Sequence, residues 1–122
     1  MTAKEKLQVI VRALDSKQGG NIEVIEITDL TVLAEYFVIC SGTSSTQVKA
    51  LADEVEYQMS EAGIEPHHIE GKATNWILLD YEGIVVHVFN QEAREFYSLD
   101  RLWSDGNKID VNQFLADMEG SH

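Results

Sequence analysis

Two short apolar runs, residues 75–81 and 84–90, constrain the fold of this chain more than any other stretch, and Glu82-Gly83 separates them. Both runs are rich in β-branched and aromatic residues, which favour strands. Glycine readily adopts the positive φ that a two-residue hairpin loop requires. The sequence therefore predicts a β-hairpin in which Tyr81 faces Ile84.

This register divides the hairpin into two faces, because successive side chains of a strand point to opposite sides of a sheet. One face is wholly apolar and is expected to pack on helices: Ile77, Leu79, Tyr81, Ile84, Val86 and Val88. The other face carries Trp76, Leu78, Asp80, Val85, His87 and Phe89. Large aromatic rings beside a carboxylate and an imidazole are more typical of a docking surface than of a closed core.

A helix is predicted over residues 91–103, directly after the hairpin, with Arg94, Tyr97 and Arg101 on one of its faces. These side chains either contact a partner or pair with acidic residues of the chain itself, and the pattern leaves both interpretations open. The candidate partner-binding residues are Trp76 at the centre, surrounded by Leu78, Asp80, His87, Phe89, Arg94 and Tyr97.

Two longer helices are predicted from capping boxes and apolar spacing. Thr2 and Glu5 begin the first helix, and Gly19-Gly20 is expected to end it. Ser44 and Gln47 begin the second, which is expected to end at Gly63. Its predicted buried stripe is Val48, Leu51, Ala52, Val55, Met59 and Ala62.

Strands are also predicted at residues 22–27 and 36–41, and we expect these two to form the parallel pair, directly or through an intervening strand. The elements together predict an α/β fold with a mixed sheet of about four to five strands flanked by helices. We expect a single domain over residues 1–122, with its core at about 3–103. Residues 104–122 are expected to be a polar C-terminal tail that can form a short helix.

The chain is strongly acidic, with nine Lys and Arg residues against 21 Asp and Glu residues and a formal net charge of −12. This charge argues against bulk nucleic-acid binding and favours a basic protein partner. No apolar run approaches the ~20 residues of a membrane span, and the N-terminus resembles neither a signal nor a transit peptide. With a single cysteine, Cys40, these features predict a cytoplasmic protein.

Four stretches have residue types that occur in catalytic or metal-binding sites. The turn at residues 41–45 precedes a helix and can in principle hold a phosphate, but it lacks the lysine of a P-loop. Asp53, Glu54 and Glu56 do not alternate as a two-metal acidic pair must, and His67 and His68 are adjacent rather than at ligand spacing. Asp80 and His87 have no nucleophile beside them. We therefore predict no catalytic residue, metal or cofactor; the alternative is a nucleotide-binding protein or a nucleotidyltransferase-like enzyme.

Several motifs together resemble the ribosomal silencing factor family (RsfS, also called Iojap). They are residues 36–45 (YFVICSGTSS), 75–81 (NWILLDY), 86–89 (VHVF), Arg94, Tyr97 and residues 99–103 (LDRLW). The resemblance covers about residues 7–103 and leaves the polar tail outside the shared pattern.

The resemblance implies a nucleotidyltransferase-like topology without transferase activity. It also implies binding to large-subunit ribosomal protein fourteen, a small basic β-barrel at the face where the subunits meet. An occupied site there prevents the small subunit from joining and lowers translation in stationary phase or under nutrient limitation. Family members also act in large-subunit assembly. An open apolar sheet face further allows a homodimer when the ribosome is absent.

Overall fold

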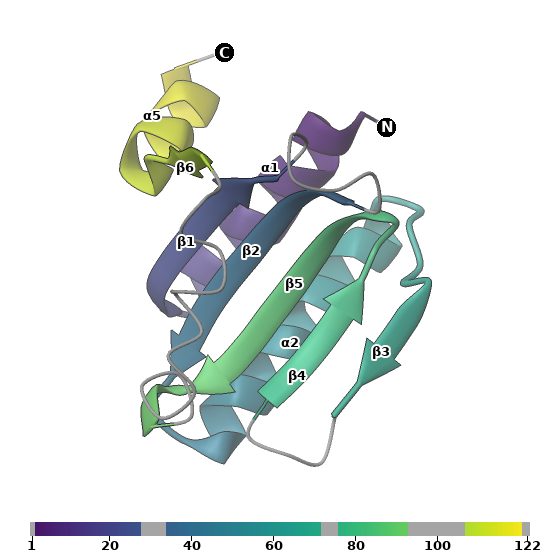
Figure 1. Ribbon diagram of the computed structural model, residues 1–122, viewed down its shortest axis with the longest axis vertical. Helices are drawn as coiled ribbons and strands as arrows, with labels where there is room; N and C mark the ends of the chain where they lie inside the picture. Colours follow the sequence, from purple (N-terminus) through teal and green to yellow (C-terminus); the bar gives the residue numbers. More distant parts are fainter. Residues whose placement is uncertain (1, 28–33, 72–75, 93–106, 121–122) are drawn as a thin grey trace.

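The computed structural model of the chain describes residues 2–27, 34–71, 76–92 and 107–120, with residues 107 and 117–120 described by their backbone only. Within these residues, six strands form one sheet in the order β3-β4-β5-β2-β1-β6 (Figure 1). The strands are β1 Gly20–Glu26, β2 Ala34–Gly42, β3 His68–Glu70, β4 Trp76–Asp80, β5 Gly83–Asn90 and β6 Asn107–Ile109. The helices are α1 Ala3–Ser16, α2 Ser45–Glu61 and α5 Val111–Gly120.

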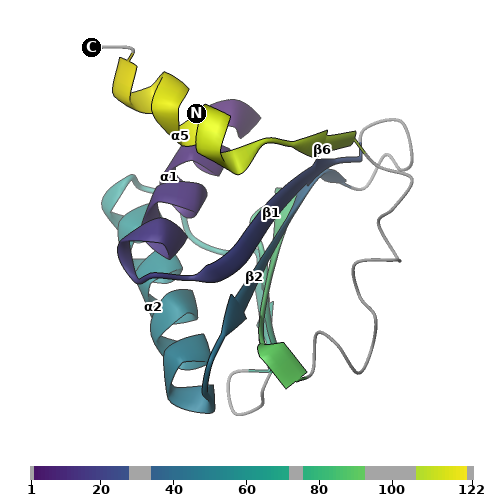
Figure 2. The same ribbon diagram turned by 90° about the vertical axis from the view of Figure 1, so that its left-hand side faces the viewer.

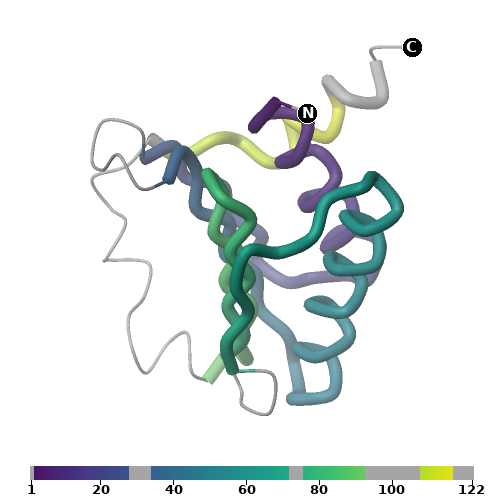
Figure 3. Tube along the Cα trace, turned by 90° about the vertical axis from the view of Figure 1, so that its right-hand side faces the viewer, coloured from purple at the N-terminus to yellow at the C-terminus, as the bar shows by residue number. Residues whose placement is uncertain are grey.

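The two long helices, α1 and α2, cover the same face of the sheet (Figure 2, Figure 3). They enclose the main hydrophobic core between themselves and the inward side chains of the strands, because burying both apolar surfaces together removes them from water. Helix α5 packs at the β1–β6 end of the sheet, against α1 and β1. The mixed α/β class predicted from the sequence is confirmed. Some of the most deeply buried core residues are Leu7, Ile10, Leu14, Val48, Leu51, Val55, Leu79, Val86 and Val88.

The hairpin has the predicted register. The Tyr81 amide donates to the Ile84 carbonyl at 2.9 Å, which closes a two-residue loop. Glu82 and Gly83 both adopt positive φ, 51° and 97°, as the hairpin turn that matches strand twist requires. Leu79 lies opposite Val86, as expected. The six residues of the predicted apolar face are all buried in the main core.

The predicted parallel pairing of the first two strands is wrong. β1 and β2 are antiparallel, with Val24 opposite Val38, whereas β2 is parallel to β5, with Val38 opposite Val86. A parallel connection needs a crossover of a dozen or more residues, and only residues 27–33 separate β1 from β2. Helix α2 lies between β2 and β5 in the chain and supplies that crossover.

Two edge strands raise the sheet from the predicted four to five strands to six. β3 lies within residues 64–74, whose polar sequence predicts a connection without a strand, and it pairs antiparallel with β4. β6 lies in the expected polar tail and pairs antiparallel with β1, with Ile109 opposite Val24. The predicted C-terminal helix is present as α5, and Phe114 on it is buried in the main core. The core therefore extends past residue 103.

The helix starts follow the prediction. Thr2 Oγ1 accepts from the Glu5 amide at 3.1 Å, and Ser44 Oγ accepts from the Gln47 amide at 3.1 Å. These bonds satisfy backbone donors that the first helical turn leaves unpaired. The end of α2 also agrees, since Gly63 follows it with a φ of 82°. One residue of the predicted buried stripe differs, because Ala62 is exposed at the last turn.

The end of α1 differs in detail from the prediction. Gln18, not a glycine, takes the left-handed conformation, with a φ of 58°. The next amide, that of Gly19, donates back to the Leu14 carbonyl at 2.9 Å, as in a Schellman motif. Gly19 is needed for a different reason: a Cβ there would collide with Cys40 Sγ on the neighbouring strand.

Candidate protein-docking surface

The candidate surface lies on the side of the β4–β5 hairpin that faces away from α1 and α2. Alternation along the two strands brings six side chains to this side, as predicted, and we call it the outer hairpin face. Within it, Trp76 lies opposite Phe89, Leu78 opposite His87, and Asp80 opposite Val85. The members of the outer hairpin face are Trp76, Leu78, Asp80, Val85, His87 and Phe89.

The outer hairpin face is partly closed rather than open. A second hydrophobic cluster, separate from the main core, lies on this side of the sheet. Phe89 is 0% exposed and His87 is 6% exposed, whereas Trp76 and Leu78 are half-buried. Phe89 and His87 therefore support the surface from beneath, and the accessible apolar members are Trp76, Leu78 and Val85. The second cluster comprises Ile25, Ile27, Ala34, Ile39 and Phe89, with Phe37, Trp76 and Val85 packed against it.

Aromatic contacts fix the orientation of Trp76. Its ring meets Phe89 edge to face, with centroids 5.9 Å apart, and lies 6.0 Å from the His87 ring. The indole Nε1–H donates to His87 Nδ1 at 3.3 Å. Phe37 of β2 meets His87 from the other side at 5.5 Å. Phe37 is not among the predicted surface residues, although it alternates with the inward Val38 in the apolar run of β2.

The environment of His87 keeps its imidazole neutral. Burial lowers the pKa of His87 to about 4, because an imidazolium would lose its hydration there. A neutral ring can accept the indole N–H at Nδ1, whereas a protonated ring cannot. Asp80 is only a diagonal neighbour of His87 on the hairpin, since it lies opposite Val85.

Asp80 has a local structural contact at the hairpin turn. Its Oδ1 accepts from the Glu82 amide at 3.0 Å, which stabilises the tight loop as an Asx turn does. The carboxylate is half-buried and still reaches the surface. It therefore helps to form the turn and lies at the edge of the outer hairpin face.

A hollow of about 360 Å³ adjoins the accessible part of the face, lined by Glu70, Gly71, Trp76 and Leu78. The hollow lies where the end of β3 runs beside β4. The sequence did not predict this arrangement, because the pattern of residues 64–74 indicates a connection. Apolar side chains next to a hollow are suited to receive a protruding side chain of a partner. Arg94, Tyr97 and most of the predicted helix over residues 91–103 lie outside the described residues.

The alternative site, at the turn before α2, is occupied by internal hydrogen bonds. The Thr43 amide and Thr43 Oγ1 both donate to Gln47 Oε1, at 2.6 Å and 2.8 Å. A bound phosphate would compete with these bonds for the same donors. Asp53 on α2 is exposed and pairs with Lys49 at 3.3 Å. The described residues contain no group of three or more His, Cys, Asp or Glu side chains that could hold a metal ion.

Helices long and apolar enough to cross a membrane are absent from the described part of the chain.

Comparisons with known proteins agree with the resemblance noted above. The family model described as "Ribosomal silencing factor during starvation" matches residues 1–122, including the tail expected to lie outside the shared pattern. A Halalkalibacterium halodurans protein named "Ribosomal silencing factor RsfS" is 35% identical over 117 residues, covering 95% of this chain and 100% of that protein. A mouse protein named "Mitochondrial assembly of ribosomal large subunit protein 1" is 32% identical, covering 84% of this chain and 46% of that protein.

One solved structure is similar to this chain in fold as well as in sequence. The crystal structure of a Chromobacterium violaceum protein matches with a TM-score of 0.82 and 32% identity, covering 85% of this chain and 88% of that one. A family match over the full length and a relative at 35% identity along its whole length establish the relationship. The chain belongs to the ribosomal silencing factor family.

Proposed function

We propose that this protein binds the large ribosomal subunit through large-subunit ribosomal protein fourteen and thereby prevents the small subunit from joining. The result is lower translation in stationary phase or under nutrient limitation, in a bacterial cytoplasm. Family membership supports the ribosomal role, and the mouse relative's name refers to the large subunit. The proposal assigns the protein a binding role without catalysis.

The observation that carries the proposal is the accessible pair Trp76 and Leu78 on a rigid aromatic base. Interface energy concentrates in large aromatic side chains at the centre of a patch, next to pockets that exclude water. Trp76 is held by Phe89 and His87, so little side-chain freedom is lost on binding. The net charge of −12 suits a basic β-barrel partner and speeds its approach.

Binding should be measured with the purified ribosomal partner and paired with a subunit-joining assay by sedimentation. Trp76→Ala is expected to cost about 2 kcal/mol or more of binding, roughly thirtyfold in affinity. Because Trp76 also packs on the second cluster, its replacement is expected to lower the melting temperature as well. Leu78→Ser separates the two effects, since Leu78 belongs to neither hydrophobic cluster.

The matched control is Tyr57→Ala, which removes an aromatic side chain that is 62% exposed on α2, across the sheet from the outer hairpin face. It should leave affinity and subunit joining unchanged. The proposal fails if folded Trp76→Ala and Leu78→Ser proteins both bind the partner as tightly as the wild type. It also fails if the wild type binds but subunits still join at the same rate.

A further inference from the structure

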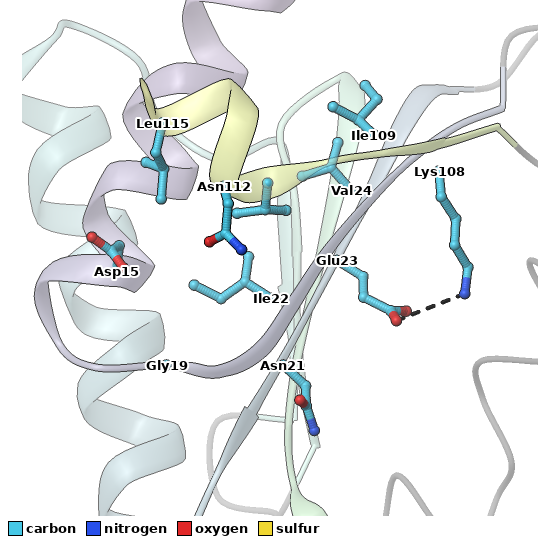
Figure 4. A pocket seen from close by; sticks show the side chains of 11 residues that line it. Asp15, Gly19, Asn21, Ile22, Glu23, Val24, Lys108, Ile109, Asn112 and Leu115 are labelled. Atoms are coloured by element: carbon cyan, nitrogen blue, oxygen red, sulfur yellow. Dashed lines mark ion pairs between the residues drawn. The ribbon is translucent and has the colours of Figure 1, made fainter. Parts of the chain in front are cut away.

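A second hollow lies at the opposite edge of the sheet from the outer hairpin face. Its volume is about 410 Å³, and α1, β1, β6 and α5 all contribute to it. We call it the α1–α5 groove. Figure 4 shows Asp15 of α1 on one side of the groove and Asn112 and Leu115 of α5 on the other, with Ile22 of β1 nearby.

The local backbone of β1 shapes this groove. The pairing of β1 with β2 shifts register between Gly20 and Glu23, and Asn21 adopts a φ of 44°. A bulge of this kind bends a strand and re-aims its side chains. Ile22 thereby lines the groove together with Leu115, both half-buried. The groove thus has an apolar wall that an aliphatic chain can cover.

The groove contains one ion pair, between Lys108 and Glu23, but its two polar side chains on α1 and α5 take no part in it. Neither Asp15 nor Asn112 has a side-chain hydrogen bond or ion pair among the described residues. Lys17 Nζ lies 3.8 Å from Glu54 Oε1 of α2, and Lys108 Nζ lies 3.8 Å from Glu23 Oε1 of β1. Both lysines thus pair with other carboxylates, and neither of them is a partner of Asp15.

The end of α1 adds to this negative potential. Asp15 and Gly19 at the end of the helix line the groove, and no basic side chain lies in its last turn. The C-terminal end of a helix carries a partial negative charge, which a cation stabilises and a carboxylate does not. A single carboxylate with one amide does not make a metal site, since a divalent cation takes more oxygen ligands.

We infer that the α1–α5 groove receives an arginine or lysine side chain from a basic protein segment. The aliphatic stem would lie on Ile22 and Leu115, and the charged head would lie between the Asp15 carboxylate and the Asn112 amide oxygen. Long basic side chains combine these two properties, an apolar stem and a charged tip. The contact is separate from the outer hairpin face and does not depend on the identity of the partner there.

The probe is an acetylated, amidated peptide of alternating glycine and arginine, titrated into the full chain and followed by amide chemical shifts. Shifts are expected to concentrate at Asp15, Ile22, Asn112 and Leu115. The same peptide with neutral citrulline in place of arginine should produce none of them. Asp15→Asn should weaken peptide binding about threefold to fivefold, the range of partly exposed charge pairs.

The matched control is Glu61→Gln, which makes the same change in net charge at an exposed position at the end of α2. It should weaken binding less than twofold. Equal effects of the two variants would mean general attraction to an acidic surface and would overturn the inference. Free spermidine giving the same shifts at the same affinity would overturn the assignment to a protein side chain, as would unchanged binding by Asp15→Asn.

Discussion

A single buried histidine couples the stability of the outer hairpin face to pH. The folded chain keeps His87 neutral down to about pH 4, whereas an unfolded histidine binds its proton near pH 6.5. The unfolded state therefore binds more protons between these values, and stability is lost as the pH falls through them. We expect His87 to contribute about 3 kcal/mol to this loss, an order-of-magnitude figure from the size of the shift.

Urea unfolding at several pH values between 7 and 4 measures the effect, with His87→Phe as the comparison. The variant keeps an aromatic ring but has no titrating group, so its stability should fall less steeply with decreasing pH. The histidine His68 is exposed and present in both proteins, so its contribution cancels. Parallel curves for the two proteins would show that burial of His87 does not control this pH dependence.

Gln18 shows a second effect at the scale of one residue. Its φ of 58° is costly for a side chain with a Cβ and natural for glycine. Gln18→Gly is therefore expected to raise the free energy of unfolding by about 0.5–1 kcal/mol. Gln18→Ala, which keeps the Cβ, should give no such gain. A loss of stability in the glycine variant, measured by urea unfolding, would contradict this account.

At the scale of elements, local patterns were predictable and distant pairings were not. The hairpin register follows from alternation and a glycine at the turn, and the sequence predicted it down to Leu79 opposite Val86. The antiparallel direction of β1 relative to β2 is not visible in the pattern of either strand. It depends on the number of residues that connect them. The buried state of Phe89 was also missed, because the second cluster draws Ile25 and Ile39 from strands remote in the sequence.

The C-terminal elements were underestimated for a related reason. β6 has three residues, too few for an alternating pattern, and α5 is a short helix of ten residues. Phe114 nevertheless lies in the main core at 9% exposure. Phe114→Ala should therefore destabilise the whole domain by about 3 kcal/mol. The control is Gln113→Ala, at an exposed position of the same helix. If Phe114→Ala altered only α5 and left the thermal unfolding of the rest of the domain unchanged, α5 would not be part of the core.

At the scale of the whole molecule, we propose that the free protein forms a homodimer through the outer hairpin face. Trp76 and Leu78 would be covered by the second copy, as apolar surface tends to be when no partner is present. The ribosomal partner would then compete for the same surface. Adding it should convert the dimer to a one-to-one complex in light scattering. A complex that keeps two copies of the chain would place dimerisation elsewhere.

The two edges of the sheet have a consequence for the protein at high concentration. An exposed edge strand offers unpaired backbone groups to other molecules, and long flat edges therefore nucleate fibrils. Here β3 and β6 are only three residues long, and both carry charged side chains, Glu70 and Lys108. Mutual repulsion between chains of charge −12 acts in the same direction. The short, charged edges thus disfavour the edge-to-edge joining of sheets from separate copies of this protein.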